Sequence, residues 1–479
     1  MTENRSHPRA ALAIAACAAL FMLATALAQT PTTSPIDPAT ARADLQWAAD
    51  TVLSVHPALT QPQTRAAFEQ TLAEQQERLG NAPSRDDVAI ALQLMLASLG
   101  DSHTTGAPQA GSARVLPVVF FAASDAILVS PVTGVDTGLP DVARLERLGD
   151  LSPAQLVDRL HRLMPGNDAW VRYQLGQIVN AEDVLRWLGV LQNGQVHITV
   201  VQPDGTHLAT SVALAPAAEL AHRGAPLQAL LQRAAGMTEA WTAHGNTYMW
   251  RIDRASGTGV FWLLSCVDSP DYRAAVDAFF SAVHDASASR VVLDLRFDRG
   301  GNSNVVTAFL RHLPSRTIHS YGVEVRPSDA LTKKRGTPLA ALSKAAVAHD
   351  GALLVMQQPG TRIALPAKAP VFHGDVVVIV NGATFSSAGI VAVMLRDNGL
   401  ARIAGSPMGA DVNGYGDILS FYTPGLLLPF KVSYKRFERP DSDAAQPDAL
   451  AIDTPVELTT SDILAGRDKL AAYLRTEGR

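Results

Sequence analysis

Apolar positions in the first part of the chain recur at helical spacing. Between Ala41 and Gly100, apolar stripes with the period of a helix predict three helices, and Gly100 is a typical helix stop. The third helix is expected to begin after Ser84, whose side chain can form a capping box with Asp87. Residues 41–110 are therefore predicted to form an N-terminal helical domain.

The pattern becomes mixed over residues 111–245. A helix is expected in "SPAQLVDRLHRLM", and strands are expected in "VLPVVFFA" and "AILVSPV". Two β-rich runs flank "PDG" at residues 203–205 and predict a β-hairpin, because these residue types favour turns. This part of the chain is predicted to be a small α+β domain.

From residue 246 onwards, apolar runs alternate with helical patterns. Four runs have the composition of buried strands: "TGVFWLLSCV", "RVVLDLRF", "DVVVIV" and "ARIAG". Helical patterns follow the first three, in "DYRAAVDAFFSAVHDA", "SNVVTAFLRHL" and "SSAGIVAVMLRDNG". These units predict an α/β core over residues 246–479 with a mostly parallel sheet. Sites in such sheets form beyond the carboxyl ends of the strands.

The N-terminal residues have the pattern of an export signal. Arg5 and Arg9 precede a long apolar run, and "ALA" ending at Ala28 has the form of a cleavage site. We expect cleavage after Ala28, a linker over residues 29–40, and a secreted or periplasmic protein. An uncleaved anchor and lipidation at Cys17 are the alternatives, and membrane contact is expected only in those cases.

Composition narrows the classes of function. The 479 residues are 47% hydrophobic and 18% charged, with a net charge of −5 and a pI of about 6.2. A nucleic-acid partner is not expected, because such partners require basic surfaces. Cys266 lies in an apolar run and is expected to be an inert core thiol. No group of side chains has the spacing of a metal site, so no metal or other cofactor is expected.

Ser386 and Ser387 lie where a predicted buried strand gives way to a predicted helix. A serine at this position can cap the helix. Alternatively, Ser386 is a nucleophile that needs a base to take its proton. The backbone N–H groups at the start of a helix would then receive the developing negative charge. Both interpretations fit these residues.

Three further loops contain groups that such a nucleophile would need. Gly300 and Gly301 lie between a strand and a helix, where paired glycines let backbone N–H groups approach a ligand. His103 follows a helix stop and is a candidate base, with Ser102 to orient it. The Gly-rich residues 404–417 form another loop near such a site. Taken singly, these segments also fit a tight turn, a surface histidine and an ordinary loop.

Taken in their order along the chain, these segments resemble the S41 serine peptidases, which include the tail-specific (C-terminal processing) proteases and the tricorn core proteases. "VVLDLRFDRGGNS" is similar to the family's Asp-Leu-Arg-x-Asn-x-Gly-Gly segment, and "NGATFSSAGIV" is similar to its nucleophile segment. "LGDSHT" resembles the Asp-x-His-Thr segment of one branch. The resemblance implies a crotonase-like α/β core, a middle domain that is a degenerate PDZ-like domain, and peptide or protein substrates.

The resemblance implies a nucleophile and an oxyanion hole. The family's nucleophile falls on Ser386, and the backbone N–H groups of Ser387 and of Gly300 or Gly301 would bind the oxyanion. The chain departs from the family pattern at Asp298, where members usually carry asparagine.

The base distinguishes two branches of the family. Tail-specific members use a lysine, but this chain has no lysine between Ser386 and Lys431. The tricorn-like branch pairs its nucleophilic serine with a histidine that is oriented through a preceding serine and an acidic residue, and Ser102 and His103 match that local pattern. His103 is therefore expected to act as general base and then general acid, with Ser102 as its orienter.

The carboxylate that completes this arrangement has several candidates near the C-terminus. They are Glu438, Asp441, Asp443 and Asp448, and Asp441 or Asp448 is favoured.

These expectations together predict a serine endopeptidase that hydrolyses peptide bonds through an acyl-enzyme on Ser386. The alternative is a catalytically inactive S41-like scaffold that binds peptides or apolar ligands. An esterase is a third possibility, although the chain lacks Gly-x-Ser-x-Gly around Ser386.

Overall fold

The computed structural model describes residues 36–473 apart from 107–112, 221–222, 236–240, 246, 337–352, 442–445 and 470–471. The predicted signal segment and Cys17 lie outside the described residues. Within the described ranges, no helix is both long enough and apolar enough to cross a bilayer.

The three predicted N-terminal helices are present. They are α2 (Pro38–Val55), α3 (Pro62–Arg78) and α4 (Arg85–Ala97), with a short 3-10 helix η2 (Pro57–Thr60) after α2. Ser84 and Asp87 form the predicted capping box at the start of α4. These helices pack together through a shared apolar face that includes Leu45, Phe68 and Leu92.

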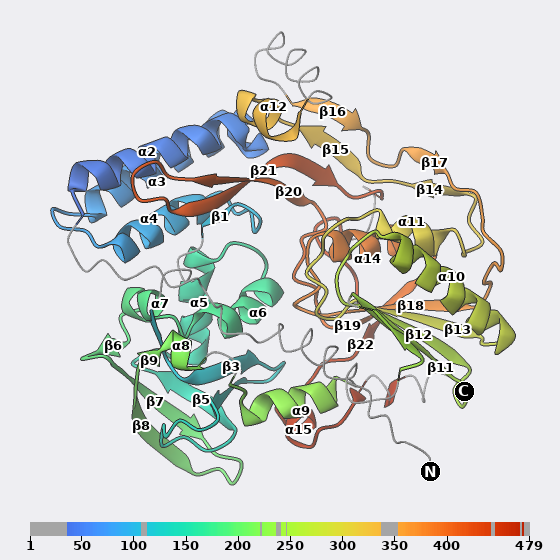
Figure 1. Ribbon diagram of the computed structural model, residues 1–479, viewed down its shortest axis with the longest axis horizontal. Coiled ribbons are helices and arrows are strands. Elements are labelled where there is room, and N and C mark those ends of the chain that lie inside the picture. The colour runs from blue at the N-terminus through green and yellow to red at the C-terminus, as the bar shows by residue number, and fades with distance from the viewer. Residues whose placement is uncertain are drawn as a thin grey trace, which may run out of the picture.

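The helices lie on a sheet formed largely by the C-terminal part of the chain (Figure 1). The five strands are β1 (Thr105–Gly106), β15 (Gly322–Val325), β16 (Leu354–Gln357), β20 (Gly414–Tyr422) and β21 (Pro429–Glu438). The long hairpin of β20 and β21 contains part of the region that the sequence suggested only as a Gly-rich loop. Because its inner face packs on α2 and α4, the helical unit shares its core with this hairpin.

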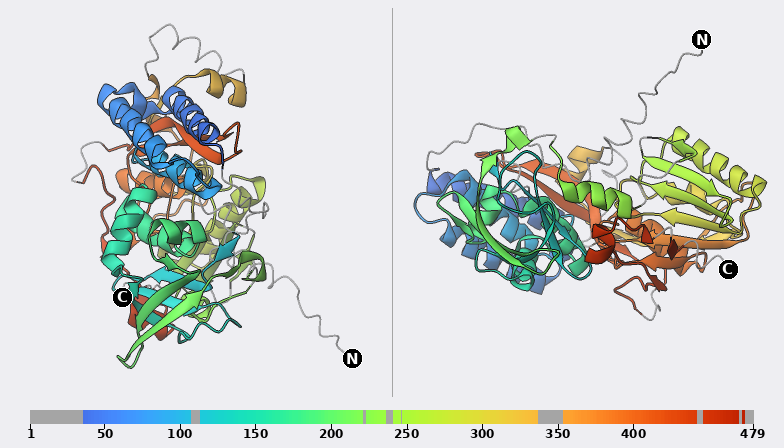
Figure 2. Two further views of the ribbon diagram at one scale, coloured as in Figure 1. Left: turned by 90° about the vertical axis from the view of Figure 1, so that its left-hand side faces the viewer. Right: turned by 90° about the horizontal axis from the view of Figure 1, so that it is seen from below.

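The middle unit is a curved sheet with helices against it (Figure 2). Its sheet has the order β3-β4-β5-β7-β6, and β8 also pairs with β7, along the whole length of that strand. The predicted hairpin is present as β7 (Gln195–Val201) and β8 (His207–Ala213), and the predicted helix as α5 (Pro153–Leu163). The other elements are β2 (Arg114–Val115), β3 (Val118–Ala122), β4 (Ile127–Pro131), β5 (Ala143–Leu148), α6 (Asp168–Ile178), α7 (Glu182–Trp187), β6 (Leu191–Gln192), β9 (Ala215–Pro216), α8 (Ala217–Leu220) and α9 (Pro226–Ala234).

The C-terminal unit is built on a seven-stranded sheet of order β10-β11-β12-β13-β18-β19-β22. Pairing is parallel from β12 to β22, as predicted, and antiparallel at the β10–β11 edge. The strands are β10 (Ala243–His244), β11 (Tyr248–Asp253), β12 (Thr258–Leu263), β13 (Arg290–Asp294), β18 (Asp375–Val380), β19 (Arg402–Gly405) and β22 (Thr454–Pro455).

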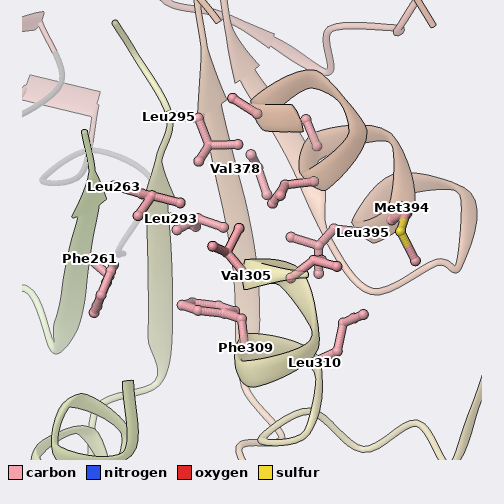
Figure 3. Packing of buried hydrophobic residues seen from close by; sticks show 14 of the residues in the cluster. Phe261, Leu263, Leu293, Leu295, Val305, Phe309, Leu310, Val378, Met394 and Leu395 are labelled. Carbon is pink, nitrogen blue, oxygen red and sulfur yellow. The ribbon is translucent and has the colours of Figure 1, made fainter. Parts of the chain in front are cut away.

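Three helices cover one face of this sheet: α10 (Pro270–Asp285), α11 (Val305–Leu310) and α14 (Ser387–Asp397). Figure 3 shows Phe261 and Leu293 from the sheet packed with Phe309 and Leu395 from α11 and α14. The remaining elements are α12 (Asp329–Arg335), α15 (Thr460–Leu464), β14 (Thr317–His319) and β17 (Arg362–Ala364). The carboxyl ends of β12, β13 and β18 meet at one edge, and the candidate site lies there.

Candidate active site

Ser386 sits at the sharp turn between β18 and α14. Its backbone has φ 54°, in the left-handed region that residues with a β-carbon rarely adopt. Ser386 occupies the N-cap position, but its side chain makes no capping hydrogen bond within the described residues. The Ser386 hydroxyl therefore does not cap the helix as the first interpretation expected, and it is left for another role.

Hydrogen bonds fix this turn to the loop after β13. The Thr384 hydroxyl donates to the carbonyl oxygen of Leu295 at 2.9 Å. The Asn381 side-chain oxygen accepts the backbone N–H of Ala383 at 3.0 Å and that of Phe297 at 3.3 Å. These bonds from both loops offset the strained backbone that presents Ser386.

His103 is held next to a buried carboxylate, that of Asp101. The backbone N–H of His103 donates to Asp101 Oδ1 at 2.9 Å, and His103 Nδ1 lies 3.8 Å from the same oxygen. The Thr104 hydroxyl and His56 Nε2 approach Asp101 Oδ2 at 2.6 Å and 3.1 Å. Because the Ala58 N–H donates to His56 Nδ1, the proton of that ring lies on Nε2 and points at Asp101.

These donors keep Asp101 ionised. Burial acts to raise the pKa of Asp101, but its interactions with His56 and His103 outweigh this effect, so the pKa lies well below its usual value. An ionised Asp101 beside Nδ1 favours the tautomer of His103 that leaves Nε2 as a proton acceptor.

The His103 ring stacks on Phe385, the neighbour of the proposed nucleophile, with ring centroids 4.5 Å apart. Its Nε2 is buried and has no hydrogen-bond partner among the described residues. Burial lowers the pKa of His103, with Lys431 acting in the same direction, while Asp101 and Asp417 act to raise it. The ring is therefore neutral at pH 7, as a general base must be.

A cavity of about 950 Å³ brings the predicted residues together. Ser102, His103, Gly301, Ser386 and Ser387 all line it, although they come from three separate segments of the chain. Within the described residues, no hydrogen bond joins Ser386 to His103, and none joins the Ser102 side chain to the His103 ring. The orienting role of Ser102 stays a prediction.

The glycine pair lies directly against the nucleophile turn. A β-carbon on Gly300 would come within 2.7 Å of Ser386 Cβ and 2.8 Å of the Ser387 nitrogen. The Gly300 N–H donates to Asp298 Oδ1 at 2.8 Å, so it is already engaged. The N–H groups of Gly301 and Ser387 make no hydrogen bond within the described residues, and both residues line the cavity. The geometry thus favours Gly301 over Gly300 as the second oxyanion donor.

The carboxylates favoured from the sequence lie elsewhere. The Asp441 N–H donates to Asp397, and Asp448 is an exposed turn residue; neither lines the cavity of His103. Asp443 lies outside the described residues. The acid that faces His103 is Asp101, two residues before it. Its place in "GDSHTT" was a usable signal, whereas the distant His56 could not be found from sequence spacing.

Metal and thiol chemistry receive no support from the side chains that the structure describes. Those side chains include no cluster of three or more His, Cys, Asp or Glu that could hold a metal ion. Cys266 is buried, and burial together with Asp298 raises its thiol pKa, which matches the predicted inert thiol.

Comparison with known proteins gives a family match over part of the chain and a fold for most of it. Residues 263–448 match the model of Peptidase family S41. The chain resembles the crystal structure of mature CPAF at 14% identity, with 92% of this chain and 97% of that chain covered and a TM-score of 0.63. It also resembles mature CPAF complexed with lactacystin at 14% identity, with 92% of this chain and 98% of that chain covered and a TM-score of 0.61. The photosystem II D1 C-terminal processing protease is 14% identical, with 92% and 97% covered and a TM-score of 0.43. No curated protein sequence matches. The likeness to CPAF establishes a shared mixed α/β fold.

Proposed function

Because residues 263–448 match peptidase family S41, we propose that the protein is a serine peptidase that cleaves peptide bonds in protein substrates through an acyl-enzyme on Ser386. One observation carries this proposal. Ser386 is held in left-handed backbone at the start of α14, in the cavity that also contains His103. That arrangement exposes a hydroxyl to a base and a helix N-terminus at the same time.

His103 is the proposed base. In the first step its Nε2 takes the proton of the Ser386 hydroxyl as Ser386 attacks the scissile carbonyl carbon, and it returns the proton to the leaving amine. Asp101 stabilises the imidazolium that forms, with His56 and Thr104 holding the carboxylate in place. The hydrogen bond between Ser386 and His103 would form when substrate binds.

The backbone N–H groups of Gly301 and Ser387 form the proposed oxyanion hole. The Ser387 hydroxyl donates to the Gly301 carbonyl oxygen at 2.8 Å, which ties the two donors to each other. Such a pair stabilises the negative oxygen of the tetrahedral intermediate, and one donor is typically worth about 10²–10³ in rate.

Replacing Ser386 with alanine should abolish hydrolysis of a casein or peptide substrate and leave the melting temperature within a few degrees. A fluorophosphonate probe should label the original protein and not the S386A variant. Ser387→Ala is the matched control: it removes the neighbouring hydroxyl but keeps the backbone N–H, so labelling should persist. Labelling of S386A would exclude Ser386 as the nucleophile. Absence of labelling in the original protein would favour the inactive, peptide-binding or apolar-ligand-binding scaffold.

The finer structural and cellular assignments are part of the same proposal. We infer that the C-terminal unit is crotonase-like and that the middle unit is a degenerate PDZ-like domain. Export by the N-terminal segment would place the peptidase outside the cytoplasm, and N-terminal sequencing of the exported protein would show a start at Gln29.

A further inference from the structure

Asp298 lies fully buried behind the proposed oxyanion hole, with 0% of its surface exposed. Its Oδ1 accepts the Gly300 N–H at 2.8 Å, and its Oδ2 accepts the Cys266 thiol at 3.3 Å. Its backbone carbonyl accepts the N–H of Phe385, next to the nucleophile, at 3.0 Å. One residue therefore contacts both loops that form the site.

No positive charge compensates this carboxylate within the described part of the chain. The nearby Arg296 is committed to Asp294, at 2.7 Å, and Arg299 is exposed. The titratable side chains that face Asp298 are Cys266, beyond the end of β12, and Tyr272 on α10. Burial raises the pKa of both, so both stay neutral and neither balances a negative charge.

An ionised carboxylate at this position works against catalysis. The oxyanion that forms on acylation would face the N–H groups of Gly301 and Ser387, and Asp298 accepts the N–H of Gly300, which precedes Gly301 and packs against Ser387. A negative charge on the buried Asp298 carboxylate would repel an oxyanion that forms at the adjoining residues. A neutral carboxyl keeps an oxygen for the Gly300 N–H and adds no charge.

We propose that Asp298 is a positioning residue that supports the oxyanion loop in its protonated form, and that its ionised form slows acylation of Ser386. The neutral acid can donate its proton to the Cys266 sulfur while Oδ1 continues to accept the Gly300 N–H. This inference rests on the proposed peptidase function and adds a pH dependence to it.

Asp298 and His103 together define the pH range in which the protein should be active. Burial raises the pKa of Asp298 to about 7, partly offset by its bonds from Gly300 and Cys266. Hydrolysis needs neutral His103, and burial lowers the pKa of that ring below 6.5. Activity should therefore fall below the pKa of His103 and again above about pH 7, with its maximum at mildly acidic pH.

Asp298→Asn replaces the carboxyl with a neutral group of the same shape. At pH 8, kcat/KM should rise about tenfold, because a group with a pKa of about 7 is then only about one-tenth neutral. At pH 6 the variant should stay within about threefold of the original protein, and the loss of activity above pH 7 should disappear. A D298N variant that still loses activity above pH 7 would overturn the proposal, as would one with the same rate ratio at both pH values.

Cys266 offers a second, matched test outside the catalytic groups. Cys266→Ala removes a donor that stabilises the ionised carboxylate, so the alkaline loss of activity should move to higher pH. Cys266→Ser keeps a donor and should leave that loss near its original pH or below it. Equal profiles for the two variants would contradict the role of Asp298.

A spectroscopic measurement separates this inference from the peptidase function. Residues 300–301 are the only Gly-Gly pair in the sequence, so glycine labelled with ¹³C at the carbonyl and ¹⁵N gives a carbonyl-selected signal for Gly301 alone. That signal should titrate near pH 7 in the original protein and lose this step in D298N. A Gly301 signal without the step overturns the coupling to Asp298, even in an active enzyme. Absence of fluorophosphonate labelling overturns the peptidase function and the effect on acylation, whatever the Gly301 signal shows.

Discussion

Two buried aspartates near the cavity have opposite pKa shifts, and their hydrogen-bond donors explain why. Asp101 accepts bonds from His56, Thr104 and the His103 backbone, so its charge is stabilised and its pKa is lowered. At Asp298 the effect of burial outweighs the bonds from the Gly300 N–H and from Cys266, so its pKa is raised. One aspartate thus supplies a permanent charge to a base, and the other can switch near neutral pH.

The charge of Asp101 should be essential for turnover. Asp101→Asn would remove it and allow the wrong tautomer of His103, so kcat should fall on the order of 10³-fold or more. Thr104→Val removes the hydrogen bonds of the Thr104 hydroxyl to Asp101 and from the Ser433 N–H but keeps the charge of Asp101, and this control should lose less than tenfold. Steady-state kinetics on a peptide substrate measures both, and a D101N variant within threefold of the original would contradict this role.

At the level of elements, the hairpin of β20 and β21 connects the helical unit to the rest of the molecule. Its tip is held by Asp44 on α2, whose two carboxylate oxygens accept the N–H groups of Gly425 and Leu426 at 2.8 Å and 2.7 Å. Trp47, one turn further along α2, makes edge contacts with Phe421 and Phe430 of the hairpin. A buried carboxylate with two backbone donors fixes the angle between the helix and the hairpin.

Replacing Asp44 with alanine should destabilise the protein by about 2–4 kcal/mol, because two part-buried N–H groups lose a buried, charged acceptor. Urea unfolding followed by circular dichroism measures this change. Asp50→Ala on the same helix removes an exposed carboxylate and should change stability by less than about 0.5 kcal/mol. Equal effects of the two substitutions would show that the Asp44 contacts contribute little.

Elements with strong local patterns were predicted, and those that depend on distant partners were not. The capping box at Ser84 and the hairpin around residues 203–205 are set by neighbours in the sequence. The β20–β21 hairpin was missed because its apolar face is explained only by α2 and α4, which lie more than three hundred residues away. Likewise, the choice of Gly301 over Gly300 depends on which N–H Asp298 engages, and no spacing rule shows that.

At the level of the whole molecule, the site is an assembly of three units. His103 follows the helical unit, and Ser386 begins a helix of the C-terminal unit. Asn167, which caps α6 in the middle unit, donates to the carbonyl oxygens of Met408 and Gly409 and to Asp411. Peptidase activity should therefore depend on all three units being docked.

Unfolding by urea should therefore abolish the activity at the same point at which it separates the units. Phe430→Ala, a large-to-small change at a side chain 2% exposed, should cost about 3–5 kcal/mol. In the original protein and in the F430A variant, fluorophosphonate labelling should be lost at the urea concentration where the far-ultraviolet circular dichroism signal changes. Tyr422→Ala, on the exposed side of the hairpin, is the control and should leave the midpoint unchanged. Labelling that survives loss of the helical signal would show a site independent of the helical unit.

The pairing of β1 with β21 also affects when activity can arise during synthesis. Thr105 and Gly106, which follow His103 directly, pair with Lys431 and Phe430. The ribosome synthesises His103 and β1 early, and it reaches β21 only after more than three hundred further residues. In the proposed mechanism, His103 therefore stays unpositioned, and the growing chain stays inactive, until β21 has been made.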